Sequence, residues 1–297
     1  MEQRQCFMVG FRFLRSRESV PRLTREIHGR TEKNPRRIYI GGTSRMPPRL
    51  TISWRDASAA RVMPPQVILE SAHPRVVGSF GNAASLATAS PEFLEKACDI
   101  AEIRLDLLAV EGVEITSRPW SRLGNIPLLF TARRGDEGGA GTFGTTERST
   151  LLMGILDEAS LVDIELASAA EMASTLTELK ARKIPWVASW HDFAGHPESF
   201  DKLPGMAHEA ALAGAACFKA AIRLHQHDDI ERLLEVFASV SDIPLSLMGM
   251  GPLASESRLR CAAAGSVLNY GYVGDAATAP GQCSAEELKQ GIEARGR

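Results

Sequence analysis

Lys219 is the residue of this sequence whose surroundings point most directly to chemistry. Among the lysines of the chain, it alone lies within an apolar, strand-like run, residues 215–222 (AACFKAAI). Burying an ammonium group is costly unless the group is paired or loses its proton. An amine that has lost its proton is a nucleophile that forms an imine with a ketone. The other interpretation is a lysine at a strand end that reaches solvent or pairs with a carboxylate, and composition alone leaves the two evenly balanced.

His191 is the second candidate, because it follows the apolar residues 186–188 and precedes Asp192. Imidazole exchanges protons near neutral pH, as a general acid or base must. If residues 186–191 and 216–222 form neighbouring strands of one parallel barrel, His191 and Lys219 both face its mouth. A core histidine with satisfied hydrogen bonds is the more common case when the residue is taken alone.

Two pairs of acidic and basic side chains follow earlier strand candidates. Glu102 and Arg104 stand two residues apart, so on a strand they point to the same face. Inside a protein such residues either neutralise each other as an ion pair or hold a polar ligand. Arg133 and Glu137 carry the same two interpretations, and their spacing does not decide between them.

The elements that must position these residues alternate between strand and helix patterns. Short apolar runs of β type are separated by longer amphipathic stretches. The expected strands are residues 75–80, 99–104, 127–133, 161–165, 186–191, 216–222, 244–248 and 266–271. The expected helices are residues 91–97, 146–157, 168–182, 208–213, 228–240, 255–264 and 284–293. The connection between the second and third strands has the least clear helix.

This alternation, repeated eight times over residues 74–297, predicts a (β/α)8 TIM barrel with its active site at the carboxyl ends of the strands. An open doubly wound sheet is the alternative. Such a sheet usually has a GxGxxG turn after its first strand, and residues 81–85 (GNAAS) do not match that motif. Residues 135–144 are rich in glycine but lack the Lys-Ser/Thr ending of a phosphate-binding loop.

Residues 1–73 are predicted to be a basic, poorly ordered N-terminal extension of the barrel domain at 74–297. They contain many arginines and prolines and no sustained hydrophobic period. An Arg-rich, acid-poor start can bind nucleic acid or an anionic membrane, and residues 1–62 are also compatible with an organelle transit peptide. A plain extension, or a true start at Met46 or Met63, is the interpretation we prefer.

Composition excludes several classes of protein. A formal net charge of −2 with 44% hydrophobic residues is typical of a folded globular chain. No apolar stretch reaches the roughly 18 residues that a membrane-spanning helix needs. The five cysteines are scattered, form no CxxC pair and indicate reduced thiols in the cytoplasm, with no zinc site.

A series of short segments resembles the type I 3-dehydroquinate dehydratase (3-dehydroquinase) family, in order and with similar spacing. Lys219 stands where the family has its imine-forming lysine. The segments are residues 102–106 (EIRLD), 130–133 (FTAR) with 137–139 (EGG), 163–165 (DIE), 189–193 (SWHDF), 248–249 (MG) with 257–259 (SRL), and 279–282 (APGQ). Trp190 replaces the usual tyrosine beside the histidine, and Thr278 replaces the usual serine.

The resemblance implies a carbon–oxygen lyase that converts 3-dehydroquinate to 3-dehydroshikimate and water in the shikimate pathway of aromatic amino acid biosynthesis. It implies that Lys219 forms a Schiff base, that His191 acts as general acid and base in a syn elimination, and that Glu137 orients His191. The implied substrate-binding residues are Ser79, Glu102, Arg104, Arg133, Arg258, Thr278 and Gln282.

The same resemblance implies a small-molecule substrate as the partner, with no cofactor, metal, nucleic acid or membrane. It leaves a homodimer open, since the sequence carries no interface signal. Two rivals remain at this level: another class I lysine aldolase on a related barrel, and a homologue that binds the ligand without turning it over.

Overall fold

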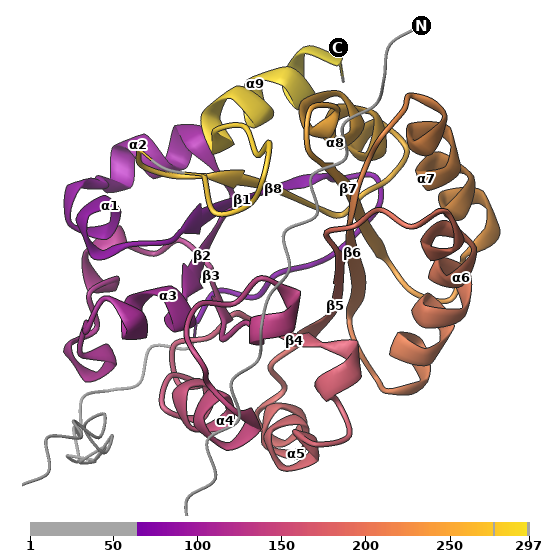
Figure 1. Cartoon of the computed structure of the whole chain (residues 1–297). Helices are drawn as coiled ribbons and strands as arrows, with labels where there is room; N and C mark the ends of the chain where they lie inside the picture. Colours follow the sequence, from indigo (N-terminus) through magenta and orange to yellow (C-terminus); the bar gives the residue numbers. More distant parts are fainter. Residues whose placement is uncertain (1–63, 276, 296–297) are drawn as a thin grey trace, which may run out of the picture. The chain divides into compact units, whose positions relative to one another are not determined.

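Eight parallel strands, each followed by a helical connection, alternate along the part of the chain that the computed structural model describes, residues 64–275 and 277–295 (Figure 1). The strands are β1 Arg75–Phe80, β2 Ile100–Arg104, β3 Leu128–Thr131, β4 Leu161–Glu165, β5 Trp186–Asp192, β6 Cys217–Arg223, β7 Leu245–Met250 and β8 Leu268–Tyr272. The helices are α1 Ala83–Thr88, α2 Pro91–Ala97, α3 Leu105–Val110, α4 Thr145–Met153, α5 Ala173–Arg182, α6 Pro197–Leu212, α7 Asp228–Ser239, α8 Ala254–Ala263 and α9 Ala285–Arg295.

The strands form one sheet in the order β7-β6-β5-β4-β3-β2-β1-β8, with all neighbouring pairs parallel. The sheet closes on itself between β7 and β8, where the Val267 N–H donates to the Leu245 carbonyl at 2.9 Å. The Ser246 hydroxyl donates to the Leu268 carbonyl at 2.6 Å across the same seam. The predicted (β/α)8 barrel is therefore confirmed, with the helices outside the ring of strands (Figure 1).

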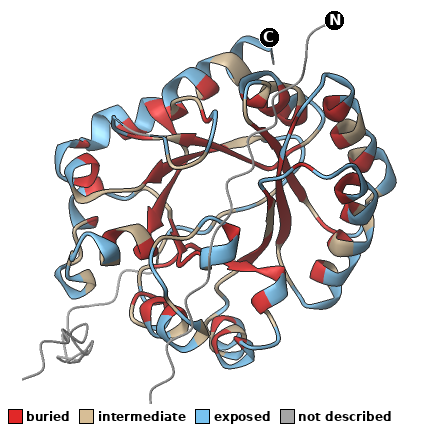
Figure 2. Ribbon diagram, in the orientation of Figure 1, coloured by how far each residue is buried: buried red, intermediate tan, exposed pale blue. Residues whose placement is uncertain are grey.

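Two apolar cores stabilise this barrel. The larger lies between the strands and the surrounding helices, where the strand residues are almost all buried (Figure 2). The smaller fills the lower barrel interior with side chains such as Val77, Leu129, Leu161 and Val187. These apolar side chains fill the barrel interior toward the amino-terminal ends of the strands. The polar side chains come later on the same strands and therefore lie toward the carboxyl ends.

The prediction of an N-terminal extension covers residues 1–73, of which residues 1–63 lie outside the described part of the chain. Residues 64–73 form neither helix nor strand. Val67 and Leu69 of this stretch nevertheless pack against the inner core of the barrel. The described end of the predicted extension thus contributes to the barrel floor.

The prediction for α6 was wrong in extent, because the helix spans Pro197–Leu212 and not only residues 208–213. The helix continues through Pro204, although a proline inside a helix removes one of its hydrogen bonds. Phe200 and Leu203 of this helix are buried against the barrel core. The Asp192 carboxylate also holds the first turn, accepting the His196 N–H at 2.9 Å and the Ser199 hydroxyl at 2.6 Å. Tertiary packing and this carboxylate outweigh the local cost of the proline.

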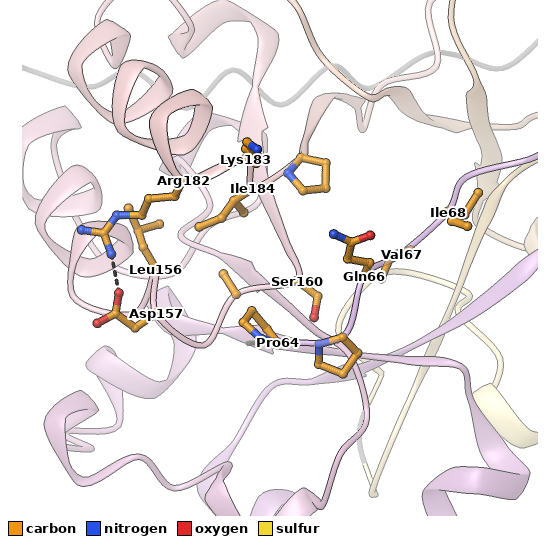
Figure 3. Close-up of a pocket in the computed structure, with 13 residues that line it drawn as sticks. Pro64, Gln66, Val67, Ile68, Leu156, Asp157, Ser160, Arg182, Lys183 and Ile184 are labelled. Atoms are coloured by element: carbon orange, nitrogen blue, oxygen red, sulfur yellow. Dashed lines mark hydrogen bonds and ion pairs between the residues drawn. The ribbon is translucent and has the colours of Figure 1, made fainter. Parts of the chain in front are cut away.

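A cavity of about 470 Å³ lies at the amino-terminal end of β4 and β5 (Figure 3). Residues 64–68 form one wall, and residues 156–160 and 182–185 form the other. Asp157 and Arg182 are paired at its edge. This is the end of a barrel at which (β/α)8 enzymes do not place their chemistry, so volume alone does not identify the site.

No helix within residues 64–275 and 277–295 is long and apolar enough to cross a bilayer.

Replacing Trp120 by alanine is expected to lower the free energy of unfolding by about 3–5 kcal/mol, as large-to-small core substitutions do. The Trp120 ring is 1% exposed and meets Phe130 edge-on at 5.0 Å, and its Nε1 donates to Glu158 at 2.7 Å. Urea denaturation measures the loss. Phe93→Ala, at a side chain that is 39% exposed, is the control and should change stability by about 0.5 kcal/mol or less.

Candidate active site

Lys219 projects from β6 into the barrel interior, in register with Ser189 of β5 and Ser246 of β7. It is 4% exposed, and its Nζ donates to Asp163 Oδ2 at 3.1 Å. The ammonium position also lies 4.4 Å from the centroid of the Tyr270 ring. Burial lowers the pKa of Lys219, and the Asp163 carboxylate only partly opposes that shift. The predicted buried amine is therefore present, with a carboxylate partner.

His191 lies on β5, where a carboxylate holds its ring in place. Glu137 Oε2 lies 3.0 Å from the ring Nδ1 and accepts the His191 backbone N–H, also at 3.0 Å. The Phe193 ring stacks alongside at 6.3 Å between centroids. Burial lowers the pKa of His191 well below 6.5, and the nearby cations Arg133 and Lys219 lower it further. The ring is thus neutral at neutral pH and available as a base.

Glu137 follows β3 in a short 3-10 turn, Gly135–Glu137. Burial raises the pKa of Glu137 to about 7, although the Arg133 cation pulls it down. The carboxyl group and the imidazole lie in contact, so the two groups titrate as a coupled pair.

Lys219 and His191 line the same cavity at the carboxyl ends of the strands. Every residue predicted for the site from the sequence also lines it, including Ser79 of β1, Thr278 and Gln282. The structure thus gathers side chains from distant parts of the chain around one space. The roles of the individual residues are argued below as proposals.

Arg104 and Arg133 form buried ion pairs, with carboxylates other than the ones that stand nearest to them in the predicted pairs. Arg104 donates to both oxygens of Asp106, at 2.9 and 2.7 Å. Burial acts to raise the pKa of Asp106, but Arg104 holds it below its ordinary value. Arg133 lies 2.9 Å from Asp163 and 3.0 Å from Glu165. Each arginine also lines the cavity, so pairing places its guanidinium there rather than removing it.

Glu102 accepts hydrogen bonds from two hydroxyls of neighbouring strands. The Ser79 hydroxyl donates at 2.5 Å and the Thr131 hydroxyl at 2.7 Å. Glu102 and Arg104 lie on one strand as predicted, yet the arginine pairs with Asp106 and not with Glu102. The Glu102 carboxylate is thus buried next to the cavity with hydroxyl partners.

Arg258 is a buried guanidinium for which the described residues provide no ion pair. It is 1% exposed, its NH1 donates to the Tyr270 carbonyl at 2.6 Å, and its Nε has no partner there. Burial lowers the pKa of Arg258. A cation buried without a counter-charge favours an anionic ligand in the cavity that it lines.

Residues of the loop after β8 line the same cavity as this cation. The Thr278 N–H and hydroxyl donate to Gln282 Oε1 at 3.0 and 2.8 Å. Gly281 has φ +73°, and a Cβ there would lie 2.2 Å from the Gly251 carbonyl oxygen. Glycine is therefore required where the loop approaches the end of β7.

Several residues of the site had no assigned role in the sequence prediction. Asp163 and Glu165 were noted as polar residues of a strand that resembles a segment of the family, and Tyr270 was counted as part of an apolar strand. Tyr270 lines the cavity, and its buried hydroxyl has no partner within the described ranges. The contact between Asp163 and Lys219 could have been predicted if the register of β4, β5 and β6 had been known. No local sequence motif encodes that register.

The described residues contain no group of three or more His, Cys, Asp or Glu side chains arranged to hold a metal ion. The fold and the site together define a (β/α)8 barrel that buries a lysine amine and a histidine around one cavity. That arrangement is typical of enzymes that form imines with their substrates.

Comparison with known proteins identifies the family. A family model described as "Type I 3-dehydroquinase" matches residues 79–297. The chain is 34% identical over 224 residues to a 3-dehydroquinate dehydratase of Methanothrix thermoacetophila, covering 75% of this chain and 92% of that protein. It is 32% identical over 214 residues to the Methanosarcina mazei enzyme of the same name, covering 69% and 88%.

Solved structures agree with this result. A 3-dehydroquinate dehydratase from Geobacillus kaustophilus superimposes with a TM-score of 0.67 at 25% identity, covering 78% of this chain and 96% of that one. A type I enzyme from Clostridium difficile, with covalently modified comenic acid, gives 0.65 at 25%, covering 75% and 92%. The chain belongs to the type I 3-dehydroquinase family, and the resemblance predicted from its motifs is confirmed.

Removing the amine of Lys219 should raise the pH at which His191 titrates, because the Lys219 cation contributes to lowering the pKa of His191. NMR titration of ¹⁵N-labelled histidines in the wild type and in Lys219→Met measures the midpoint, and His191→Asn identifies the resonance. Lys202→Met, at an exposed lysine of α6, is the control and should leave the midpoint unchanged. A wild-type midpoint at or above 6.5 would contradict the assignment.

Proposed function

We propose that this chain dehydrates 3-dehydroquinate to 3-dehydroshikimate and water through an imine on Lys219. The observation that carries the proposal is the buried Lys219 amine, with a lowered pKa, in the same cavity as His191. Its relatives carry the name of this activity. In the shikimate pathway the reaction is a step of aromatic amino acid biosynthesis.

The first step is attack of the Lys219 amine on the substrate ketone. The carbonyl oxygen leaves as water, and a protonated imine remains on the Nζ. Removing a proton beside a plain ketone is slow, whereas a protonated imine accepts the electron pair of the broken C–H bond. Asp163, 3.1 Å from the Nζ, stabilises that positive charge.

His191 then moves the proton that the elimination requires. As a neutral base it takes the proton from the carbon beside the imine, and the electron pair shifts to form an enamine. The imidazolium next donates that proton to the hydroxyl on the following carbon, which leaves as water. Because one group takes and returns the proton, both bonds break on the same face, so the elimination is syn. Water finally hydrolyses the imine and restores the ketone oxygen and the free amine.

Glu137 positions the ring for these transfers. Its Oε2 contacts both the Nδ1 and the backbone N–H of His191, so the ring cannot rotate without losing a hydrogen bond. The Nε2 is left as the atom available to the substrate. The imidazolium formed during the elimination is stabilised as Glu137 takes up its charged form.

The cavity offers distinct partners for the polar groups of the substrate. Arg258, buried without an ion pair among the described residues, binds the carboxylate. Thr278 and Gln282 add hydrogen bonds from the loop after β8. The ring hydroxyls meet the opposite wall, formed by Ser79, Glu102, Arg104 and Arg133.

Other features of the chain remain proposals of the same kind. The division into an N-terminal extension and a catalytic barrel is one of them; Val67 and Leu69, which the sequence places in the extension, pack against the inner core of the barrel. We also propose a cytoplasmic location, without nucleic acid or membrane partners, and a homodimer. The scattered cysteines and the family of small-molecule enzymes support this part of the proposal.

Borohydride reduction in the presence of 3-dehydroquinate should attach the substrate carbon skeleton to Lys219, as mass spectrometry of peptides detects. Turnover should produce an enone that absorbs in the near ultraviolet. His191→Asn should still form the adduct but lose about 10²- to 10⁴-fold in kcat, the usual contribution of a general acid or base. An adduct without enone formation by the wild type would favour an aldolase-like enzyme. Lys219 left unmodified would favour a barrel that only binds the ligand.

Replacing Arg258 by methionine should raise KM by about 10- to 100-fold, since a hydrogen-bonded charge contributes roughly 1.5–3 kcal/mol. Steady-state kinetics with 3-dehydroquinate measure the change. The matched control is Arg260→Met on the same helix, where the guanidinium pairs with Glu231 at the surface. Equal KM values for the two variants would show that Arg258 does not bind the carboxylate.

A further inference from the structure

A buried row of alternating charges runs from helix α4 to Lys219. Each member is at most 4% exposed. Successive contacts measure 2.5, 3.0, 2.9 and 3.1 Å, along the order Arg148, Glu165, Arg133, Asp163 and Lys219. Charges in so dry a place interact much more strongly than charges in water. A change at one end of the row is therefore felt at the other.

Arg148 begins this row but is absent from the lining of the catalytic cavity. Its NH1 contacts Glu165 Oε2 at 2.5 Å, and its NH2 donates to the Ser168 hydroxyl at 2.9 Å and reaches Met172 Sδ at 3.3 Å. None of these partners lines the catalytic cavity. The contact that joins Arg148 to the row of charges is its ion pair with Glu165.

We propose that Arg148 is a positioning residue for Lys219: by binding one oxygen of Glu165, it keeps Arg133 shared between Glu165 and Asp163. The inference rests on the proposed function for its catalytic meaning. It concerns a residue that touches neither the substrate nor the reacting atoms, and it assigns that residue to the control of the reactive amine.

Glu165 is the point at which this control acts. Its Oε2 meets Arg148, and its Oε1 accepts from Arg133 and from the Arg134 backbone N–H at 3.0 Å. Without Arg148, the Glu165 carboxylate is left with one cation in a buried site, where an uncompensated charge is costly. Arg133 is then drawn toward Glu165 and away from Asp163. Asp163 becomes a less shared, stronger partner for the Lys219 ammonium.

The charged and titratable groups around Lys219 set the sign of the result. Asp163 and Glu102 favour the ammonium, whereas Arg133 disfavours it. On the remaining sides, His191 is held neutral, and burial raises the pKa of Tyr270 well above 10, so neither adds charge near neutral pH. Loss of the Arg148 cation and withdrawal of Arg133 act in the same direction. Both favour the ammonium and leave less free amine.

The test is the pH dependence of Lys219 acetylation by trace acetic anhydride, followed by mass spectrometry without any substrate. Arg148→Met should move the midpoint to higher pH and reduce labelling near pH 7 on the order of tenfold, which corresponds to about one pKa unit. Arg148→Lys keeps the charge and should recover most of the labelling. Arg260→Met, which removes a surface guanidinium paired with Glu231, should match the wild type.

Glu165→Gln is a second variant, for which the expected shift in the midpoint pH of Lys219 labelling is opposite to that of Arg148→Met. It keeps the proposal falsifiable if Arg148→Met does not fold. Removing this carboxylate should move the midpoint of Lys219 labelling to lower pH. Combining Glu165→Gln with Arg148→Met removes both charges of the pair and should bring the midpoint back toward that of the wild type. Unchanged midpoints in the folded variants would overturn the proposal.

Kinetics supply a readout that a purely structural role would not move. In Arg148→Met, kcat/KM for 3-dehydroquinate should fall near neutral pH and recover at alkaline pH, where the amine is free again. A loss of equal size at every pH would mean that Arg148 only supports the fold, and would overturn the proposal. If the wild type shows no turnover, the proposed function fails, yet the labelling midpoints still decide the link between Arg148 and Lys219.

Discussion

The pairing of the Lys219 amine with Asp163, away from water, is the interaction on which the rest of the site depends. Burial by itself drives the lysine toward its uncharged form, while an unshared carboxylate would restore the ammonium. Asp163 is not unshared, because Arg133 lies 2.9 Å from its Oδ1 and the Ser189 hydroxyl donates to the same oxygen at 2.6 Å. Burial and the shared carboxylate thus act in opposite directions on the charge of the Lys219 amine.

The barrel makes this balance possible. Its lower interior is filled with apolar side chains, so the polar layer above stands on a floor without water, where electrostatic interactions are strong. The cations that line the cavity also differ in their partners. Arg104 and Arg133 pair with acidic groups, whereas Arg258 has no ion pair among the described residues.

The strands were the most predictable part of the fold. Buried parallel strands are continuous apolar runs, and β1 and β4 have the bounds that their sequences indicate. Helix α6 was underestimated, because Pro204 is a local signal for a break and the packing that overrides it is not local. The site was predictable as a set of residues through the resemblance of its motifs. The partners of those residues were not predictable. Arg104 has an acidic residue two positions before it and another two positions after it, and the spacing alone does not reveal that it pairs with Asp106 and not with Glu102.

The sequence by itself determined the alternation of strands and helices and the family. It also identified the amine of Lys219 and the imidazole of His191, which lie on the neighbouring strands β6 and β5. Only the tertiary structure decided which charges meet. Lys219 pairs with a carboxylate 56 positions earlier, and Arg133 bridges to Ser189, also 56 positions away. Such pairs depend on the register of a closed sheet and on how deep each side chain lies in it. Local periodicity carries neither quantity, because both are set by how all eight strands pack around one interior.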